Sequence, residues 1–310
     1  MKMHPRVSVV IPTRNRPESV RRAVMSVLSQ TVEDIELIVV IDGPDLCTAG
    51  VLSEMHDRRL RYVELPRNVG GSEARNEGIR QARTDWIALL DDDDEWFPAK
   101  LERQLSAVER TPYILPVIAT QVIARSSQGD FIWPRRPPNP AEHVGEYLFV
   151  RRTMFMGEGF LQTSSLLAPR SLFQAIPFHA GLQRHEDWDW LLRVWTIRGV
   201  GLELVMEPLV VWNDDMGRSR ISTKRNWRQS LEWIQSVPHL VTPKVYAGFI
   251  VTVVSPNASK QGAWDAFGHL FKKLIICRGA RTWDFFLFFT MWLVPISLRS
   301  KVRKMFTARR

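Results

Sequence analysis

The chain has 310 residues, twelve tryptophans and a formal net charge of +9. Its two cysteines, Cys47 and Cys277, cannot form a disulfide framework, and no spacing matches a zinc site. The segment 264–310 holds ten Lys or Arg against two Asp, so it carries +8 of the net charge. The rest of the chain is nearly neutral, which argues against a nucleic-acid-binding fold, because such a fold has a basic stripe of its own.

The length suits one large α/β domain with an appendage. We expect a domain over residues 1–220, a helical extension over 221–263 and a basic, hydrophobic tail over 264–310. The chain passes almost directly from Met1 into the apolar run Val7 to Ile11, which leaves no room for a secretory leader. We therefore expect a cytoplasmic protein with reduced cysteines.

The first ninety residues alternate apolar strands with amphipathic helices. Strands are predicted at 7–11, 35–41, 60–65 and 86–90. One helix is predicted after the first strand, with Val20, Ala23, Val24, Val27 and Leu28 on one face, and another over 70–82. This alternation is typical of a parallel sheet with helices on both faces. In such sheets ligands bind beyond the carboxyl ends of the strands.

The middle of the chain is less regular. Four prolines between Pro134 and Pro140 predict a loop. Further strands are expected at 117–124, 160–168 and 202–212. A helix is expected over 186–198, ended by Gly199.

Five consecutive acidic residues, from Asp91 to Glu95, follow the apolar strand that ends at Leu90. Neighbouring like charges repel by about 1 kcal/mol per pair even in water, so this run needs a positive partner. A divalent cation is the usual one, because it takes carboxylate oxygens as ligands and can carry a phosphorylated substrate on its other face. A solvated acidic turn is the alternative.

Two other strand ends carry polar residues. The segment 12–16 joins the first strand to the first helix, where backbone N–H groups and the helix dipole suit a phosphate. It lacks a glycine-rich fingerprint, and an ordinary connection is the alternative. Asp42, which precedes Gly43, could accept hydrogen bonds from a nucleobase or ribose, or serve only the turn. Arg75, in a helix opened by two glycines, could pair with the acidic run or with a diphosphate, or lie on the surface.

Asp187 lies at the start of a predicted helix, among aromatic residues. Its carboxylate could take a proton from an attacking hydroxyl group, even with an ordinary pKa of about 4. The alternative is a helix cap together with an ion pair between Asp189 and Arg193.

Taken in order, these motifs resemble the family 2 inverting glycosyltransferases, which have the nucleotide-diphospho-sugar fold called GT-A. The resemblance covers roughly residues 6–215. The matching segments are 9–15, 41–43, 68–76, 89–96 and 186–187. It implies an α/β fold with a mixed, mostly parallel sheet flanked by helices.

The resemblance also implies a role for each matching residue. The donor would be bound by Pro12, Thr13, Asn15, Asp42, Arg75 and Asp92, with Asp42 at the base and Asp92 at the ribose. Asp91 and Asp93 would be the ends of the Asp-x-Asp motif and hold Mg²⁺ or Mn²⁺. Asp187 would be the catalytic base. Glu186, Thr163 and Ser164 would lie on the acceptor side.

The implied activity is metal-dependent, inverting transfer of a sugar from a nucleotide-diphospho-sugar, with UDP or dTDP favoured as the carrier. The acceptor would be a hydroxyl group of a lipid-linked glycan in cell-surface polysaccharide assembly. The Gln-x-x-Arg-Trp motif of processive members is missing, which favours single transfers. Where some relatives supply a histidine to the metal, this chain has Asp214 and Asp215. A non-catalytic, membrane-tethered sugar-nucleotide-binding protein is the alternative.

The C-terminal tail has the composition of a membrane-surface segment. Apolar residues recur at helical spacing from Trp264 to Ile275, and the run 282–298 is almost wholly apolar, with basic residues on both flanks. This run is shorter than the roughly 20 residues of a membrane span, and it contains Asp284 and Pro295. We expect it to lie on the anionic inner face of the cell membrane, peripherally or monotopically. A buried core helix and a true span are the alternatives.

Overall fold

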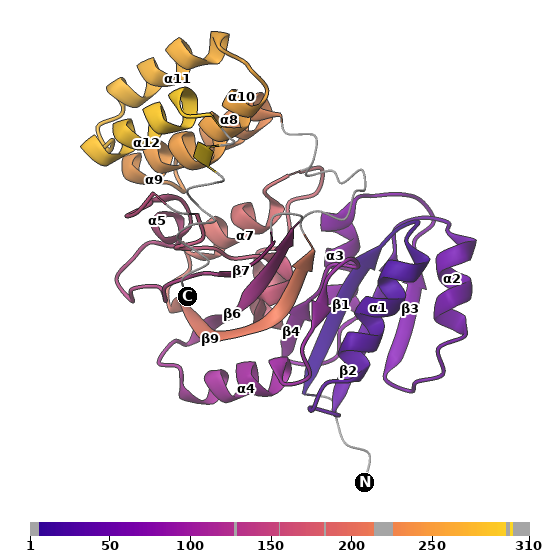
Figure 1. The fold of residues 1–310 in the computed structure, drawn as a ribbon. Helices are drawn as coiled ribbons and strands as arrows, with labels where there is room; N and C mark the ends of the chain where they lie inside the picture. The colour runs from indigo at the N-terminus through magenta and orange to yellow at the C-terminus, as the bar shows by residue number, and fades with distance from the viewer. Residues whose placement is uncertain are drawn as a thin grey trace. The chain divides into compact units, whose positions relative to one another are not determined.

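The computed structural model describes residues 6–126, 129–154, 156–182, 184–213, 226–295 and 298–299. The chain forms two compact units (Figure 1). The first consists of Met1–Pro140 and Phe160–Arg218, and the second of Ala141–Gly159 and Ser219–Arg310. The division over 1–220, 221–263 and 264–310 that was expected from the sequence stays a prediction.

Within the described residues, the first unit is built on a nine-stranded mixed sheet. One half of it consists of four parallel strands in the order β3, β2, β1, β4. Their bounds are Val7–Thr13 (β1), Ile35–Ile41 (β2), Leu60–Glu64 (β3) and Trp86–Leu89 (β4). β1 and β2 are buried along their whole length, which explains their unbroken apolar sequences. The four strands predicted in this part of the chain are confirmed.

The other half of the sheet continues from β4 in the order β8, β6, β9, β5, and β7 pairs with β6. The bounds are Leu167–Pro169 (β8), Leu115–Ser126 (β6), Val200–Asn213 (β9), Glu95–Trp96 (β5) and Gly129–Trp133 (β7). β8 is antiparallel to β4 and β6, whereas β6 and β9 are parallel. The predicted mixed, mostly parallel sheet is therefore confirmed.

The strand predicted over 160–168 is wrong, because a 3₁₀ turn at Thr163–Ser165 interrupts it. Gln162 accepts a hydrogen bond from the backbone N–H of Ser164 at 2.8 Å, and the hydroxyl of Ser165 donates to the Gln162 carbonyl at 2.7 Å. Such local bonds between side chain and backbone compete with strand pairing.

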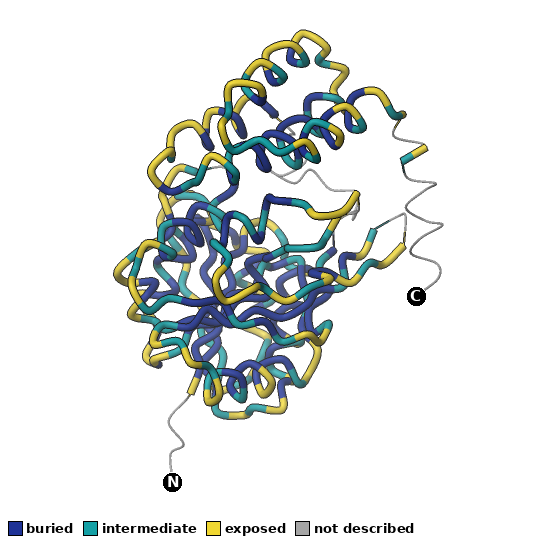
Figure 2. The backbone as a smooth tube through the Cα atoms, turned by 90° about the vertical axis from the view of Figure 1, so that its left-hand side faces the viewer, coloured by how far each residue is buried: buried dark blue, intermediate teal, exposed yellow. Residues whose placement is uncertain are grey.

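Helices cover both faces of the parallel half-sheet. α1 (Pro17–Leu28) buries Val20, Ala23, Val24 and Val27 on the face that carries Val9 and Ile11. α3 (Gly71–Gln81) lies on the opposite face, where Gly78 meets Val10 and Val40. A Cβ atom at Gly78 would collide with Val10, so the glycine lets the helix lie close to the sheet. Figure 2 shows the chain in the interior of this unit in dark blue, the colour of buried residues.

The described part of the first unit has four further α-helices: α2 (Leu46–Ser53), α4 (Lys100–Arg110), α6 (Arg170–Ala175) and α7 (Glu186–Val194). α2, α4 and α6 were not predicted from the sequence. α7 starts where the sequence predicts but ends at Val194 instead of Arg198. The chain then turns through Gly199, whose φ of +89° is a conformation that favours glycine.

The described part of the second unit is helical. Its α-helices are α5 (Val144–Phe149), α8 (Trp227–Ser236), α9 (Pro243–Phe249), α10 (Ser255–Lys260), α11 (Asp265–Ile276) and α12 (Thr282–Leu293). A π-helical turn at Ile250–Val254 joins α9 to α10. The core of this unit is aromatic: Phe249 packs edge-to-face on Phe149 at 5.0 Å between ring centroids and lies 5.3 Å from Trp233.

α12 is apolar on nearly every side. It buries Leu287, Phe288, Met291 and Trp292, and the buried carboxylate of Asp284 pairs with Arg281 at 2.7 Å. None of the described helices is both long and apolar enough to cross a bilayer. Residues 300–310, which contain half of the basic residues of the predicted tail, lie outside the described part of the chain.

Candidate active site

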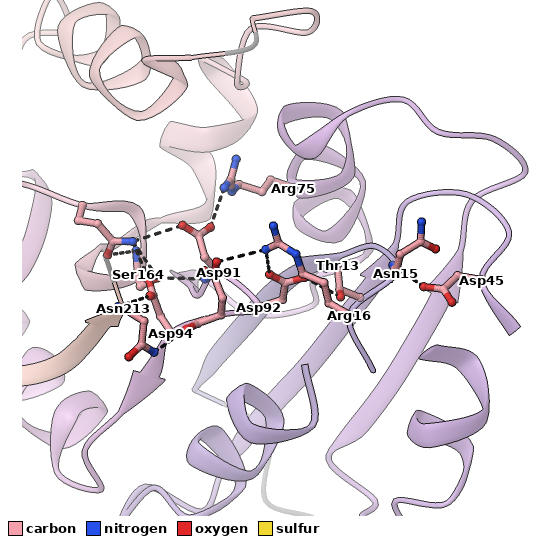
Figure 3. A network of polar contacts seen from close by, with 12 residues as sticks. Thr13, Asn15, Arg16, Asp45, Arg75, Asp91, Asp92, Asp94, Ser164 and Asn213 are labelled. Carbon is pink, nitrogen blue, oxygen red and sulfur yellow. Dashed lines mark hydrogen bonds and ion pairs between the residues drawn. The ribbon is translucent and has the colours of Figure 1, made fainter. Parts of the chain in front are cut away.

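Three strand ends converge at one edge of the sheet, because β1 lies between β2 and β4. Thr13 ends β1, Asp42 follows β2, and the acidic run 91–94 follows β4. Figure 3 shows Thr13 beside Asp92 of this run. The hydroxyl of Thr13 donates to Asp92 Oδ2 at 2.8 Å, which ties the first strand end directly to the acidic run.

The four aspartates alternate between buried and partly exposed positions. Asp92 and Asp94 are only 5% and 1% exposed. The side chains of Asp91 and Asp93 keep 26% and 22% of their surface accessible. The two carboxylates that reach the solvent edge are therefore the two ends of the Asp-x-Asp sequence.

Two arginines supply positive charge to the acidic run. Arg16 Nη1 lies 2.7 Å from Asp92 Oδ1 and 3.2 Å from Asp93 Oδ2, and Arg75 Nη2 lies 2.6 Å from Asp91 Oδ1. Burial, together with the charge of Asp93, raises the pKa of Asp92 to about 6, although Arg16 and Thr13 favour its ionised form. Part of the compensating charge that was expected from a cation thus comes from the protein.

The carboxylate oxygens at the solvent edge fit a Mg²⁺-like cation that takes some of its ligands from the protein and the rest from water and a substrate. Among the described residues, no three His, Cys, Asp or Glu side chains converge to form a complete protein cage. Mg²⁺ commonly uses one or two carboxylates and takes its other ligands from water and substrate phosphates. Asp91 and Asp93, at the tip of β4, offer such a pair. Asp214 and Asp215, the other suggested ligands, lie outside the described residues.

The fourth aspartate holds the acidic run in place. Asp94 Oδ2 accepts hydrogen bonds from Ser164 Oγ at 2.7 Å and from Gln162 Nε2 at 2.8 Å. Ser164 Oγ in turn accepts from the backbone N–H of Asp91 at 3.0 Å. At the end of β9, Asn213 Nδ2 donates to the carbonyl of Asp93 at 2.7 Å. The roles of Asp94 and Asn213 were not predicted from the sequence, since their partners come from distant parts of the chain.

Two of the residues suggested for the acceptor side are buried here. Ser164 is 0% and Thr163 is 4% exposed. The hydroxyl of Ser164 is already bonded within the acidic run. The acceptor-side role of these two residues stays a prediction. In this structure the Ser164 hydroxyl accepts a hydrogen bond from the backbone N–H of Asp91.

The predicted donor-binding residues lie around the same edge. Pro12 and Thr13 are buried, while Asn15 is exposed and has a φ of +53°. The backbone N–H of Asn15 donates to Asp45 Oδ2 at 2.6 Å. Although burial favours the protonated form of Asp45, hydrogen bonds from Thr48 and from Asn15 hold its pKa below the ordinary value. Asp45 was not identified from the sequence.

Asp42 holds the loop that precedes α3. Its carboxylate accepts the backbone N–H groups of Val69 at 2.7 Å and Gly70 at 3.0 Å. The loop between β3 and α3 is therefore fastened to the end of β2. The contacts of Asp42 with a base, and those of the other donor-binding residues, stay predictions.

Asp187 lies in the first turn of α7, after His185 in a left-handed conformation with a φ of +63°. Burial and the charges of Glu186 and Asp91 raise the pKa of Asp187 to about 7, although the N–H of Trp188 and the guanidinium of Arg75 oppose this shift. The expectation of an ordinary pKa is therefore wrong. The alternative ion pair is also present, because Arg193 Nε lies 2.7 Å from Asp189 Oδ2.

Arg75 links the neighbour of Asp187 to the acidic run. Its Nη1 lies 3.1 Å from Glu186 Oε1, while its Nη2 binds Asp91. The side chain of Arg75 is 8% exposed. The fold thus brings residues 75, 91 and 186 into one bridge, although they are far apart in the sequence.

Residues 8–176 match the sequence model of the family described as Glycosyl transferase family 2. The chain is 28% identical over 248 residues to the amylovoran biosynthesis glycosyltransferase AmsB of Erwinia amylovora, a match that covers 77% of this chain and 80% of AmsB. It is 36% identical over 105 residues to the succinoglycan biosynthesis protein ExoO of Rhizobium meliloti, covering 34% of this chain and 30% of ExoO.

The fold is similar to that of residues 1–349 of TarS from S. aureus. The TM-score is 0.60 at 16% identity, and the match covers 93% of this chain and 90% of the TarS chain. The structure of the same TarS fragment in complex with UDP-GlcNAc gives a TM-score of 0.58 at 15% identity, with the same coverage of both chains. This likeness shows a shared GT-A architecture.

Proposed function

This chain belongs to glycosyl transferase family 2, and from that premise we propose that it adds a sugar to a growing cell-surface polysaccharide. The donor is a nucleotide-diphospho-sugar, and UDP or dTDP is its carrier. The acceptor is a hydroxyl group of a lipid-linked glycan, reached from the cytoplasmic face of the membrane in single transfers. The names of AmsB and ExoO, for amylovoran and succinoglycan biosynthesis, support a polysaccharide product. The UDP-GlcNAc complex of TarS supports a uridine donor.

One observation carries this proposal: the site holds acids in two different environments. Asp91 and Asp93 lie at the solvent edge of the sheet, each beside an arginine. Asp187 lies in a helix start where burial raises its pKa to about 7. Acids held in such different environments within one site are typical of groups with separate chemical roles.

Asp187 is the proposed general base. A carboxylate with a pKa near the working pH is well suited to accept a proton, because a useful fraction is ionised and its basicity is raised. As the acceptor oxygen attacks the anomeric carbon, its proton passes to Asp187. The bond from that carbon to the diphosphate oxygen breaks on the opposite side, so the configuration inverts. The electron pair of the broken bond leaves with the nucleoside diphosphate.

Asp91 and Asp93 are the residues that would hold Mg²⁺ or Mn²⁺. When bound, such an ion stabilises the negative charge that develops on a leaving diphosphate. Arg16 lies beside Asp93 at 3.2 Å, and it adds positive charge to the same edge. The 2.8 Å hydrogen bond between Thr13 and Asp92 connects the end of β1 to the same acidic run.

We further propose that the second unit binds the inner face of the cell membrane through α12. Besides its buried face, α12 exposes Phe286, Phe289 and Leu293. These residues recur three to four positions apart, so they form one apolar stripe. The sequence around this helix is basic, which suits anionic lipid.

Release of nucleoside diphosphate tests the enzyme proposal. The full chain is incubated with a panel of UDP- and dTDP-sugars, Mn²⁺ and a lipid-linked glycan extract. We expect release from at least one donor and its loss in Asp93→Asn. The matched control is Asp130→Asn on β7, because Asp130 is also an aspartate but is paired with Arg125 at 3.4 Å on a hairpin. No release from any donor, or equal release by Asp93→Asn, would contradict the proposal.

A further inference from the structure

The bridge formed by Arg75 has a geometry that few side chains can provide. One guanidinium binds two carboxylates at once: Asp91 at 2.6 Å and Glu186 at 3.1 Å. A guanidinium presents its donors in a rigid planar fork, whereas a lysine ammonium is a single point charge on a flexible stem. Arg75 is therefore suited to fix the distance between its two partners.

The two partners of Arg75 belong to opposite sides of the proposed reaction. Asp91 is at the edge where the diphosphate leaves. Glu186 precedes Asp187, the proposed base, in the first turn of α7. Arg75 comes from α3 and packs 5.7 Å from the ring centroid of Phe178, which restricts its movement. The bridge thus fastens the helix that carries the base to the strand end that carries the leaving-group site.

We propose that Glu186 is a positioning residue, which acts through Arg75 to hold Asp187 at a set distance from the leaving-group site. This inference rests on the proposed glycosyl transfer and adds a role for Glu186 that does not require contact with the acceptor. Placement of the base matters because small errors in the position of a catalytic group cost large factors in rate.

The bridge also sets the charge around the base. Among the described residues, the charges that act on the pKa of Asp187 are those of Glu186 on its own helix, Arg75 on α3 and Asp91 after β4. The adjacent His185 stays neutral, because burial and the charge of Arg184 lower its pKa to about 3. Glu186 and Arg75 act on the pKa of Asp187 in opposite directions: the carboxylate raises it and the guanidinium lowers it.

Three substitutions separate position from charge. Glu186→Gln keeps the shape of the side chain but removes its charge. Glu186→Asp keeps the charge but shortens the side chain by one methylene, so its reach to Arg75 is lost. Arg75→Lys keeps a positive charge without the fork. Each is compared with Arg193→Gln, which removes an arginine from an ion pair on the same helix away from the acidic run.

Steady-state kinetics over pH 5.5–9 then test the proposal, after circular dichroism has shown that each variant is folded. We expect all three substitutions to lower kcat by about 10-fold or more, and the two Glu186 variants to keep a KM for the donor within about twofold of the wild type. The acid limb of the rate profile should move to lower pH in Glu186→Gln and stay nearly in place in Glu186→Asp. Arg193→Gln should keep both kcat and the profile.

The positioning role would be overturned by wild-type kcat in both Glu186 variants, or by an Arg75→Lys enzyme that works as well as the wild type. A fall in kcat with an unmoved acid limb in Glu186→Gln would also overturn it, because a merely structural residue would act in that way. If the wild-type chain turns over no donor, the proposed glycosyl transfer itself is wrong. That result is distinct from a failure of the positioning role, which requires an active wild type.

Discussion

The hydroxyl of Ser164 lies 2.7 Å from the carboxylate of Asp94, and both residues are almost completely buried. The same hydroxyl accepts the backbone N–H of Asp91 at 3.0 Å. One serine therefore fastens both ends of the aspartate run to the 3₁₀ turn at Thr163–Ser165. Since Asp91 and Asp93 are the proposed metal ligands, this contact sets the shape of their loop.

Replacing Ser164 with Ala should weaken both stability and metal use. The change leaves the part-buried N–H of Asp91 and the buried carboxylate of Asp94 each short of one partner. An unsatisfied buried polar group costs roughly 1–3 kcal/mol. We expect a lower melting temperature and a higher Mn²⁺ concentration for half-maximal activity. Differential scanning fluorimetry and a Mn²⁺ titration of turnover measure the two effects.

Ser165→Ala is the matched control for this change. Ser165 is also buried, but its hydroxyl donates to the carbonyl of Gln162 and is not bonded to an aspartate. It should lower the melting temperature without raising the Mn²⁺ requirement. If both variants need the same Mn²⁺ concentration as the wild type, Ser164 does not shape the metal site.

The rate of transfer should rise with pH through about 7. A general base must be ionised to accept a proton, and the pKa of Asp187 is raised to about 7. Below that pH the carboxylate is protonated and turnover falls, whereas above it the rate levels off. Asp187→Asn should cut kcat by about 10²-fold or more while UDP-sugar binding, measured by calorimetry, stays near the wild-type value. A variant that keeps most of its turnover would remove Asp187 from this role.

β1 and β2 could be predicted because each is a short run, rich in β-branched residues and buried along its whole length. α4 could not, because its buried positions include Lys100 and Gln104 as well as Leu101 and Leu105. The Lys100 ammonium lies 3.6 Å from the ring centroid of Trp96 and bonds to Gln104, a pairing that only the folded chain provides. Polar residues with such partners conceal the apolar face on which sequence periodicity depends.

The acidic run illustrates the same limit at the candidate site. Its need for positive charge follows from the sequence, because four adjacent aspartates repel one another. The sequence does not reveal that Arg16 supplies part of that charge, since the contact requires β1 to lie beside β4. The partners of Asp94 come from residues about 70 and 119 positions away. Such contacts become visible only once the strand order is known.

Asp187 should also lower the stability of the protein at neutral and alkaline pH. The unfolded chain releases this proton near pH 4, whereas the folded chain holds it up to about pH 7. Between these values the folded state binds more protons, so its stability falls as the pH rises. The full penalty is present above about pH 7. Asp187→Asn carries no such penalty, so it should melt at a higher temperature than the wild type at pH 8.

The pH dependence distinguishes this effect from general stabilisation. The melting-temperature difference between Asp187→Asn and the wild type should shrink as the pH is lowered from 7 toward 4, where both side chains are neutral. Thermal melts at intervals of half a pH unit measure it. A difference that is constant over this range would show that ionisation of Asp187 is not its cause.

Lipid binding should depend on the exposed stripe of α12. Phe286 and Leu293 are 47% and 64% exposed, and full burial of such a side chain contributes roughly 1.5–3 kcal/mol. The double variant Phe286→Ser/Leu293→Ser should therefore bind vesicles at least about 10-fold more weakly, with an unchanged melting temperature. Flotation with phosphatidylcholine vesicles containing phosphatidylglycerol measures the binding.

Leu46→Ser is the control, because Leu46 is 87% exposed but belongs to the first unit. Equal flotation of the double variant and the control would show that this stripe does not enter the lipid. A wild-type chain that does not float would remove the membrane proposal and leave the enzyme proposal intact.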